Sequence, residues 1–321
     1  MEANIIIVFG PVPSRRLGRS LGINNIPAKV CTYSCVYCQL GATIKERVER
    51  RRFYRPEHIF KAVVGIVEEA RERGEKIDYL TFVPDGEPTL DIALGREISM
   101  LRELGIRIAV ITNASLVHRP DVREDLSEAD LVSLKLDAVS EDIWLRVNRP
   151  HSSLKLDDIL SGMLRFAEEF DGDILTETML IEGVNAKKEE ITLIAEFLSE
   201  LKPDRAYVAI PTRPPAEDWV KPADEHFINI AYQKFSGKLG KGRVEYLIGY
   251  EGDAFALTGN VVEDLLSITS VHPMREEAVK KFLEKAETHW DVINELIKEG
   301  KLIELEYEGH KFYMRKLPTR R

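Results

Sequence analysis

The sequence VCTYSCVYCQLG (residues 30–41) contains all three cysteines of this 321-residue chain, Cys31, Cys35 and Cys38. An odd number of cysteines within eight residues does not form a disulfide framework, which needs an even number spread along the chain. Thiolates select soft metals such as zinc and the irons of iron–sulfur clusters. Structural zinc takes four protein ligands, and the nearest histidine, His58, lies twenty residues beyond Cys38. The loop therefore favours a four-iron cluster with one iron left open for a small chelating molecule, with zinc or free thiols as alternatives.

Around this loop, from residue 20 to about 211, short β-rich runs alternate with longer amphipathic stretches typical of helices. The short runs are apolar throughout, which is typical of parallel strands covered on both faces. Six such units in a row predict an α/β fold that forms a barrel or an incomplete barrel. The expected strands are residues 20–26, 78–83, 107–112, 131–136, 173–180 and 205–210.

Polar residues follow or end most of these strands, where the catalytic groups of α/β barrels lie. We expect them to converge on the cysteine loop and to include the residues that bind cofactor and substrate. They are Asp85, Gly86 and Glu87 after the second strand, Asn113 after the third, Lys135 and Asp137 around the end of the fourth, Glu177 in the fifth and Arg213 after the sixth.

The rest of the chain differs in pattern from this barrel region, which we assign to residues 1–215. Residues 216–258 begin Pro-rich and are expected to form a connector or lid. Residues 259–321 predict three helices followed by two strands joined at Glu308-Gly309, the order of a small winged-helix-like domain.

The spacing Cys-x-x-x-Cys-x-aromatic-Cys, with Tyr37 at the aromatic position, resembles the signature of the radical S-adenosylmethionine (SAM) superfamily. The sequence DGEP (residues 85–88) resembles the Gly-Gly-Glu motif of that family, although Asp85 stands where the family has glycine. The resemblance covers residues 10–215. It implies a partial (β/α)6 radical SAM barrel and a [4Fe–4S] cluster on the three cysteines, with S-adenosylmethionine bound at the open iron. It also implies an external one-electron reductant of the ferredoxin or flavodoxin type.

The same resemblance implies roles for individual residues. Tyr37 would lie beside the adenine, and Glu87 with the backbone of Asp85 and Gly86 would hold the α-amino group of S-adenosylmethionine. Asn113 and Glu177 are candidates for contacts to the ribose or the methionine by position alone. The resemblance does not name the catalytic residues, and their candidates, from position near the strand ends, are Lys135, Asp137 and Arg213. If Lys135 points inward it could hold an anionic or carbonyl substrate, and pairing with Asp137 is the simpler alternative.

A longer match narrows the resemblance to one group within the family. The sequence FGPVPSRRLGRSLGINNIP (residues 9–27) before the cysteines and RVNRPH (residues 146–151) resemble Fe–S oxidoreductases related to the tRNA wyosine-synthesis enzymes (4-demethylwyosine synthase). Those enzymes carry a second cluster on additional cysteines. This chain has no cysteine left to hold one, so we expect one thiolate-bound cluster and an activity other than 4-demethylwyosine synthesis.

The charge pattern bears on the substrate. A net charge of −9 argues against general nucleic-acid binding, yet residues 15–55 contain ten basic residues and only two acids, Glu46 and Glu49. A basic face next to the cluster would suit phosphates, so tRNA is the leading substrate hypothesis. A small metabolite, a partner protein to be activated, or a surface of ordinary ion pairs are the alternatives. The basic residues are Arg15, Arg16, Arg19, Lys29, Lys45, Arg47, Arg50, Arg51, Arg52 and Arg55.

A winged-helix regulator with an Fe–S sensor is a different class of function. In winged helices the third helix enters the DNA major groove, and here residues 288–300 carry acids that would repel phosphate. These are Asp291, Glu295 and Glu299, against one basic residue, Lys298. We therefore do not expect DNA as a partner, and a basic tail with Arg315, Lys316, Arg320 and Arg321 remains as a weaker RNA contact.

The composition predicts where the protein works. No apolar run reaches the ~20 residues that span a bilayer, and an acidic residue precedes the first apolar run, which is wrong for a secretory signal. We therefore expect a cytoplasmic protein without a membrane segment. Its abundant Glu, Lys, Arg and Ile are typical of proteins from thermophiles.

Overall fold

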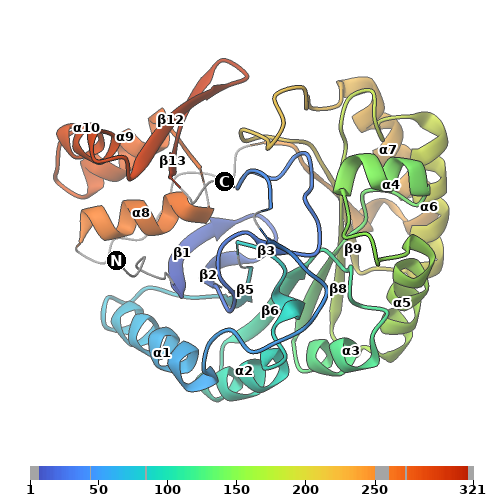
Figure 1. The fold of residues 1–321 in the computed structure, drawn as a ribbon, viewed down its shortest axis with the longest axis horizontal. Helices are drawn as coiled ribbons and strands as arrows, with labels where there is room; N and C mark the ends of the chain where they lie inside the picture. The colour runs from blue at the N-terminus through green and yellow to red at the C-terminus, as the bar shows by residue number, and fades with distance from the viewer. Residues whose placement is uncertain (1–6, 44, 84, 250–259, 272, 317–321) are drawn as a thin grey trace.

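The computed structural model describes residues 7–43, 45–83, 85–249, 260–271 and 273–316. Its largest element is an eight-stranded sheet in the order β1-β2-β5-β6-β7-β8-β9-β10, which curls into a partial barrel with helices around its outside (Figure 1). Strand β1 is antiparallel to β2, and the other neighbouring pairs are parallel. The strands are β1 Val8–Ser14, β2 Gly18–Ile23, β5 Tyr79–Phe82, β6 Arg107–Thr112, β7 Leu131–Lys135, β8 Asp173–Met179, β9 Arg205–Ala209 and β10 Val244–Leu247.

The helices between the strands bury one apolar face against the outside of the sheet. In α1, for example, Ile59, Val63 and Val67 repeat every four residues and are all buried, which is the pattern of an amphipathic helix. The helices are α1 Pro56–Glu72, α2 Leu94–Leu101, α3 Pro120–Ser127, α4 Glu141–Asn148, α5 Leu156–Glu169, α6 Lys188–Leu201 and α7 Glu225–Leu239.

Alternation along the strands decides which side chains enter the barrel. In β7, Val132 and Leu134 belong to the outer core under the helices, whereas Leu131 packs with Leu175 of β8 in a small inner core. Side chains two and four residues apart on a strand share a face. Lys135 therefore points into the barrel above Leu131, and Glu177 does so above Leu175.

The partial α/β barrel expected from the sequence is confirmed, and its six expected strands correspond to β2 and β5 to β9. Two further strands extend the sheet. Strand β1 escapes the sequence pattern because it contains Pro11 and Pro13, which a sheet tolerates at an edge. Strand β10 lies in residues 216–258, expected as a connector or lid, and pairs with β9 over four residues. That part of the segment therefore belongs to the sheet, and residues 250–258 lie outside the described residues.

The C-terminal part forms a small unit beside β1 (Figure 1) with an apolar core of its own. Three helices precede a hairpin that turns at Glu308 and Gly309, both with positive φ, as the sequence predicted. Strand β11 adds a third strand, and the winged-helix assignment stays a prediction. The elements are α8 Val261–Val271, β11 Met274–Arg275, α9 Glu276–Lys285, α10 Asp291–Lys298, β12 Leu302–Tyr307 and β13 His310–Arg315.

Within the described residues, every helix is too short or too polar to cross a lipid bilayer. The predicted basic tail is only partly described, because Arg320 and Arg321 lie outside the described ranges.

Candidate active site

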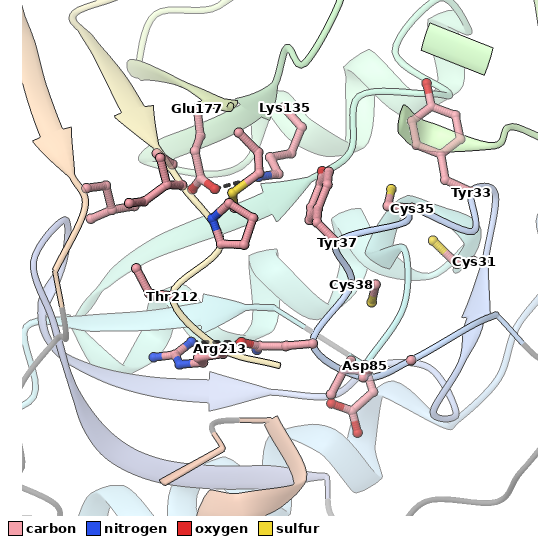
Figure 2. Close-up of a pocket in the computed structure, with 18 of the residues that line it drawn as sticks. Cys31, Tyr33, Cys35, Tyr37, Cys38, Asp85, Lys135, Glu177, Thr212 and Arg213 are labelled. Atoms are coloured by element: carbon pink, nitrogen blue, oxygen red, sulfur yellow. Dashed lines mark hydrogen bonds and ion pairs between the residues drawn. The ribbon is translucent and has the colours of Figure 1, made fainter. Parts of the chain in front are cut away.

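A cavity of about 310 Å³ opens at the carboxyl ends of the parallel strands, where the last residues of β7, β9 and β10 reach it. The cysteine loop forms one end of this cavity. In Figure 2, Lys135, Glu177 and Arg213 lie on the side away from Cys31 and Cys35, with Tyr37 and Cys38 in between. Nine of the twelve residues singled out from the sequence line it. They are Cys31, Cys35, Tyr37, Cys38, Asp85, Gly86, Lys135, Glu177 and Arg213.

The three cysteines are free thiols that are partly buried and face the same cavity. Two of the sulfurs accept hydrogen bonds from side-chain amides. Asn113 Nδ2 lies 3.5 Å from Cys31 Sγ, and Asn148 Nδ2 lies 3.5 Å from Cys35 Sγ. Burial raises the pKa of each thiol, that of Cys35 to about 12. Because iron binds the thiolate, the cluster would be bound with release of protons.

The three cysteines lie on one loop and face one cavity, as the ligands of a cluster with one open iron would. Among the described residues, no three His, Cys, Asp or Glu side chains are placed to hold one metal ion. In a four-iron cluster each thiolate binds a different iron, so the sulfurs lie further apart than around one zinc. Three thiols on one loop, with amide donors behind two of them, are therefore a fitting donor set for a [4Fe–4S] cluster.

The cysteine loop is tied to the DGEP segment by backbone pairing. Lys29 N donates to Asp85 O at 2.6 Å, and Glu87 N donates to Val30 O at 3.1 Å. Between these two bonds lies Gly86, where a Cβ would come within 2.0 Å of Val30 O. Only glycine allows this approach, so the glycine of the motif is required by the contact with the cluster loop.

Glu87 does not line the cavity. Glu87 is only 1% exposed. Its carboxylate accepts hydrogen bonds from the Thr112 hydroxyl at 2.6 Å, the Thr89 hydroxyl at 2.6 Å and the backbone N–H of Asn113 at 2.7 Å. Burial raises the pKa of Glu87, and these hydrogen bonds oppose the rise. The carboxylate therefore joins the loops after β5 and β6.

Asn113 also supports the loop from behind. Its Nδ2 bonds Thr32 Oγ1 at 2.7 Å as well as Cys31, and its Oδ1 accepts from Ser115 N at 2.9 Å. With both ends of the amide bonded inside the protein, Asn113 orients the cysteine loop.

Asp137 lies behind Tyr37 and does not line this cavity. The Tyr37 hydroxyl donates to Asp137 Oδ2 at 2.5 Å, and the same carboxylate accepts from Asn148 Nδ2 at 2.8 Å and Met179 N at 2.9 Å. The Lys135 ammonium lies 5.0 Å from the centre of the Tyr37 ring, within cation–π range. Asp137 thus holds the Tyr37 ring in place at the cavity wall.

Lys135 points inward and pairs with Glu177, its neighbour across β7 and β8, rather than with Asp137. The distance from Lys135 Nζ to Glu177 Oε1 is 2.5 Å, and Arg16 binds the other carboxylate oxygen. Burial opposes ionisation of Glu177, but the charges of Lys135 and Arg16 outweigh it and lower its pKa to about 2. Arg213 extends this charged end and donates to Gln39 Oε1 at 2.9 Å.

Arg16 and Lys29 line the site but entered the sequence analysis only as part of the basic stretch, and Arg16 is the one that binds Glu177. It sits in the tight turn between β1 and β2, at the amino ends of the parallel strands, and its side chain reaches Glu177 inside the barrel. Its position could not be predicted from the sequence, because the first strand of this hairpin, β1, contains two prolines and does not look like a strand.

Much of the basic stretch is engaged in ion pairs and ring contacts rather than forming a continuous basic face. Arg50, with its side chain 5% exposed, pairs with Asp121 and Asp125, and Arg19 pairs with Glu75. Further along, Arg47 and Arg51 lie over the Phe53 ring. Arg51, Arg52 and Arg55 are exposed to solvent.

Comparison with known proteins agrees with the geometry of the site. The Radical SAM superfamily profile matches residues 25–198. UPF0026 protein MJ1312 of Methanocaldococcus jannaschii is 51% identical over 314 residues, which cover 98% of this chain and 97% of that protein. A UPF0026 protein of Helicobacter pylori (strain ATCC 700392 / 26695) is 31% identical over 289 residues, 88% of this chain and 90% of that protein.

Among solved structures, that of TYW1 with a lysine-pyruvate adduct bound has a TM-score of 0.53 at 17% identity. It covers 71% of this chain and 82% of that one, and the likeness concerns the fold. The profile match and the UPF0026 relatives place this chain in the radical SAM superfamily, as a member of the UPF0026 proteins.

Proposed function

We propose that this enzyme cleaves S-adenosylmethionine reductively and uses the resulting 5′-deoxyadenosyl radical to abstract hydrogen from a substrate in the same cavity. The observation that carries the proposal is that Cys31, Cys35 and Cys38 face one cavity whose opposite wall is charged. When bound, the reduced [4Fe–4S] cluster supplies one electron to the sulfonium, which breaks the C5′–S bond and leaves methionine and the radical. Transfer of a hydrogen atom from the substrate would then give 5′-deoxyadenosine.

The cysteines and the asparagines behind them would support this chemistry. The three cysteines would each hold one iron, and hydrogen bonds to the sulfurs tune the reduction potential of such a cluster. Asn113 and Asn148 are placed to donate such bonds, since each already contacts a cysteine sulfur.

For the ammonium group of S-adenosylmethionine we assign the backbone at Gly86 rather than the Glu87 carboxylate. Gly86 lines the cavity and is held against the cysteine loop, whereas the Glu87 carboxylate already accepts hydrogen bonds from Thr112 and Asn113. Tyr37, fixed by Asp137, offers its ring to the adenine.

The electron must come from outside the chain. Cys31, Cys35 and Cys38 are the only cysteines in the sequence, so no second thiolate-bound cluster is present to relay electrons. We therefore propose a one-electron donor protein of the ferredoxin or flavodoxin type as a partner.

A tRNA nucleoside remains a candidate for the substrate, and the exposed Arg51, Arg52 and Arg55 favour it because they could contact phosphates. Deletion of the protein in its source organism, followed by mass spectrometry of tRNA nucleosides, tests this candidate. A changed nucleoside would support tRNA, and an unchanged profile would contradict it.

The cleavage itself is tested with the full chain, reconstituted anaerobically with iron and sulfide and supplied with a chemical reductant and S-adenosylmethionine. We expect 5′-deoxyadenosine and methionine in equal amounts, with none formed when iron is omitted. A protein with a full cluster that yields no 5′-deoxyadenosine would contradict the proposal, as would a preparation that binds zinc in place of the cluster.

A further inference from the structure

A second cavity, of about 160 Å³, adjoins the first inside the curled sheet and is called the inner chamber below. Its walls come from β1, the β1–β2 turn, β2, β5 and β6, together with the cysteine loop and the segment after β9. The two cavities share five lining residues, which form a partition between them. The partition residues are Arg16, Gln39, Leu40, Asp85 and Arg213.

The inner chamber is apolar away from the partition. Phe9, Val12, Leu17 and Ile111 contribute to its walls. Of its three lining hydroxyls, those of Ser20 and Thr81 bond each other at 2.7 Å, and Ser14 Oγ accepts from Leu17 N at 3.3 Å. A cavity of roughly 150 Å³ with apolar walls stays dry and binds a molecule of the size of benzene. The chamber therefore suits a compact apolar group rather than a polar one.

The partition, in contrast, contains buried polar atoms that lack partners. Arg16 Nε and Asp85 Oδ1 are buried without a hydrogen bond to any described residue, and Asp85 as a whole is only 6% exposed. An unpaired buried donor or acceptor costs roughly 1–3 kcal/mol, so such atoms call for a ligand or an ordered water. Arg16 Nε is a donor, and a ligand that satisfies it must bring an acceptor.

The charge of the main cavity points the same way. Its charged lining residues are four cations and two carboxylates, an excess of two positive charges. The oxidised cluster with three thiolates carries one net negative charge and S-adenosylmethionine one net positive charge, so the cofactors together leave this excess in place. The cations are Arg16, Lys29, Lys135 and Arg213, and the carboxylates are Asp85 and Glu177.

We propose that the inner chamber and its partition bind a small carboxylic acid, with the carboxylate between Arg16 and Arg213 and the apolar body in the chamber. Guanidinium groups present paired N–H donors that match a carboxylate, which suits this partition. The inference rests on the proposed function and adds its substrate class. A nucleotide is disfavoured because neither the size nor the apolar walls of the inner chamber fit a base with its ribose and phosphate.

Binding is tested with the full chain carrying cluster and S-adenosylmethionine, under anaerobic calorimetry, with phenylacetate as probe and 2-phenylethanol as its uncharged counterpart. We expect phenylacetate to bind and the alcohol to bind at least about tenfold more weakly, since a hydrogen bond to a charged group contributes roughly 1.5–3 kcal/mol. Arg16→Gln should weaken phenylacetate binding by a similar factor. Arg102→Gln, at an exposed arginine outside both cavities, is the matched control and should bind like the wild type.

Ile111→Phe separates the chamber from the partition. The larger ring would fill part of the chamber and leave the guanidinium groups in place, so acetate should bind as before while phenylacetate is excluded. Equal binding of phenylacetate and 2-phenylethanol to the wild type would overturn the inference, as would a tRNA transcript that binds while phenylacetate does not. Failure of the proposed function is seen separately, because it shows as absent 5′-deoxyadenosine in the wild type without any added acid.

Discussion

The two ends of the main cavity are built in different ways. The cluster end places Cys31, Cys35 and Cys38 within eight consecutive residues, so one loop carries the whole donor set. The charged end brings together Arg16 from a turn, Lys135 and Glu177 from neighbouring strands, and Arg213 from a loop. The first depends on local chain geometry, whereas the second exists only when the whole sheet is assembled.

The two ends also differ in what holds them. Cys31 and Cys35 accept hydrogen bonds from neutral side-chain amides, while Glu177 pairs with two cations and all three of these side chains are largely buried. Breaking a buried ion pair by removing one partner costs roughly 3–5 kcal/mol, because a charge is left uncompensated. Damage at the cluster end should therefore abolish chemistry with little loss of stability, and damage at the charged end should cost stability.

The largest effect is expected for Cys35→Ser. It removes one of three iron ligands and should reduce 5′-deoxyadenosine formation to the level of protein reconstituted without iron. The free energy of unfolding of the cluster-free protein should change by less than about 1 kcal/mol, because the substitution is small and the site is partly exposed. Iron content, product assay and urea unfolding measure the three quantities. Retained 5′-deoxyadenosine formation would mean that Cys35 is not an essential ligand of the cluster.

A smaller effect is expected for Glu177→Gln, which should lower the stability of the protein. The pKa of Glu177 falls from 4.5 to about 2 on folding, so its contribution to stability is present above pH 4.5 and lost as the pH falls towards 2. At pH 7 we expect a loss of about 3 kcal/mol in the free energy of unfolding, from 1.36 kcal/mol per pKa unit. Urea unfolding of both proteins between pH 7 and pH 3 should show the difference shrinking. A difference that stays constant with pH would mean that the carboxylate charge is not what stabilises this end.

The smallest effect is expected for Tyr37→Phe, which tests the wall that connects the two ends. The ring remains, but Asp137 loses one of three donors, which should lower the free energy of unfolding by roughly 1 kcal/mol. If the ring contacts the adenine, KM for S-adenosylmethionine should change severalfold in Tyr37→Phe and much more in Tyr37→Ala. Equal KM values in both variants would remove Tyr37 from the cofactor site.

The cluster end was predictable from the sequence, since ligand spacing on one loop does not depend on tertiary structure. The six central strands were predictable for a similar reason, because each is a continuous apolar run. Alternation within a strand even predicts that Leu131 and Lys135 share a face, but which face enters the barrel depends on how the sheet curls.

The charged end was predictable only in part. Lys135, Glu177 and Arg213 were expected near strand ends, but the pairing of Lys135 with Glu177 requires the register between β7 and β8. Arg16 required a hairpin whose first strand contains two prolines. Glu87 was expected in the cofactor site from its motif alone, and the structure directs its carboxylate to Thr89 and Thr112, partners that only the packing of two loops brings within reach.

Arg315, in the last strand of the C-terminal unit, lies close enough to Asp85 to influence its pKa, which burial raises to about 7. At the turn of the same hairpin, the Tyr307 hydroxyl donates to Pro211 O at 3.3 Å. Residues more than two hundred positions after the cysteine loop thus complete one corner of the site. During synthesis the cysteine loop leaves the ribosome long before this corner is made. The surroundings of Asp85 and Pro211 are therefore complete only once the final hairpin has packed against the barrel.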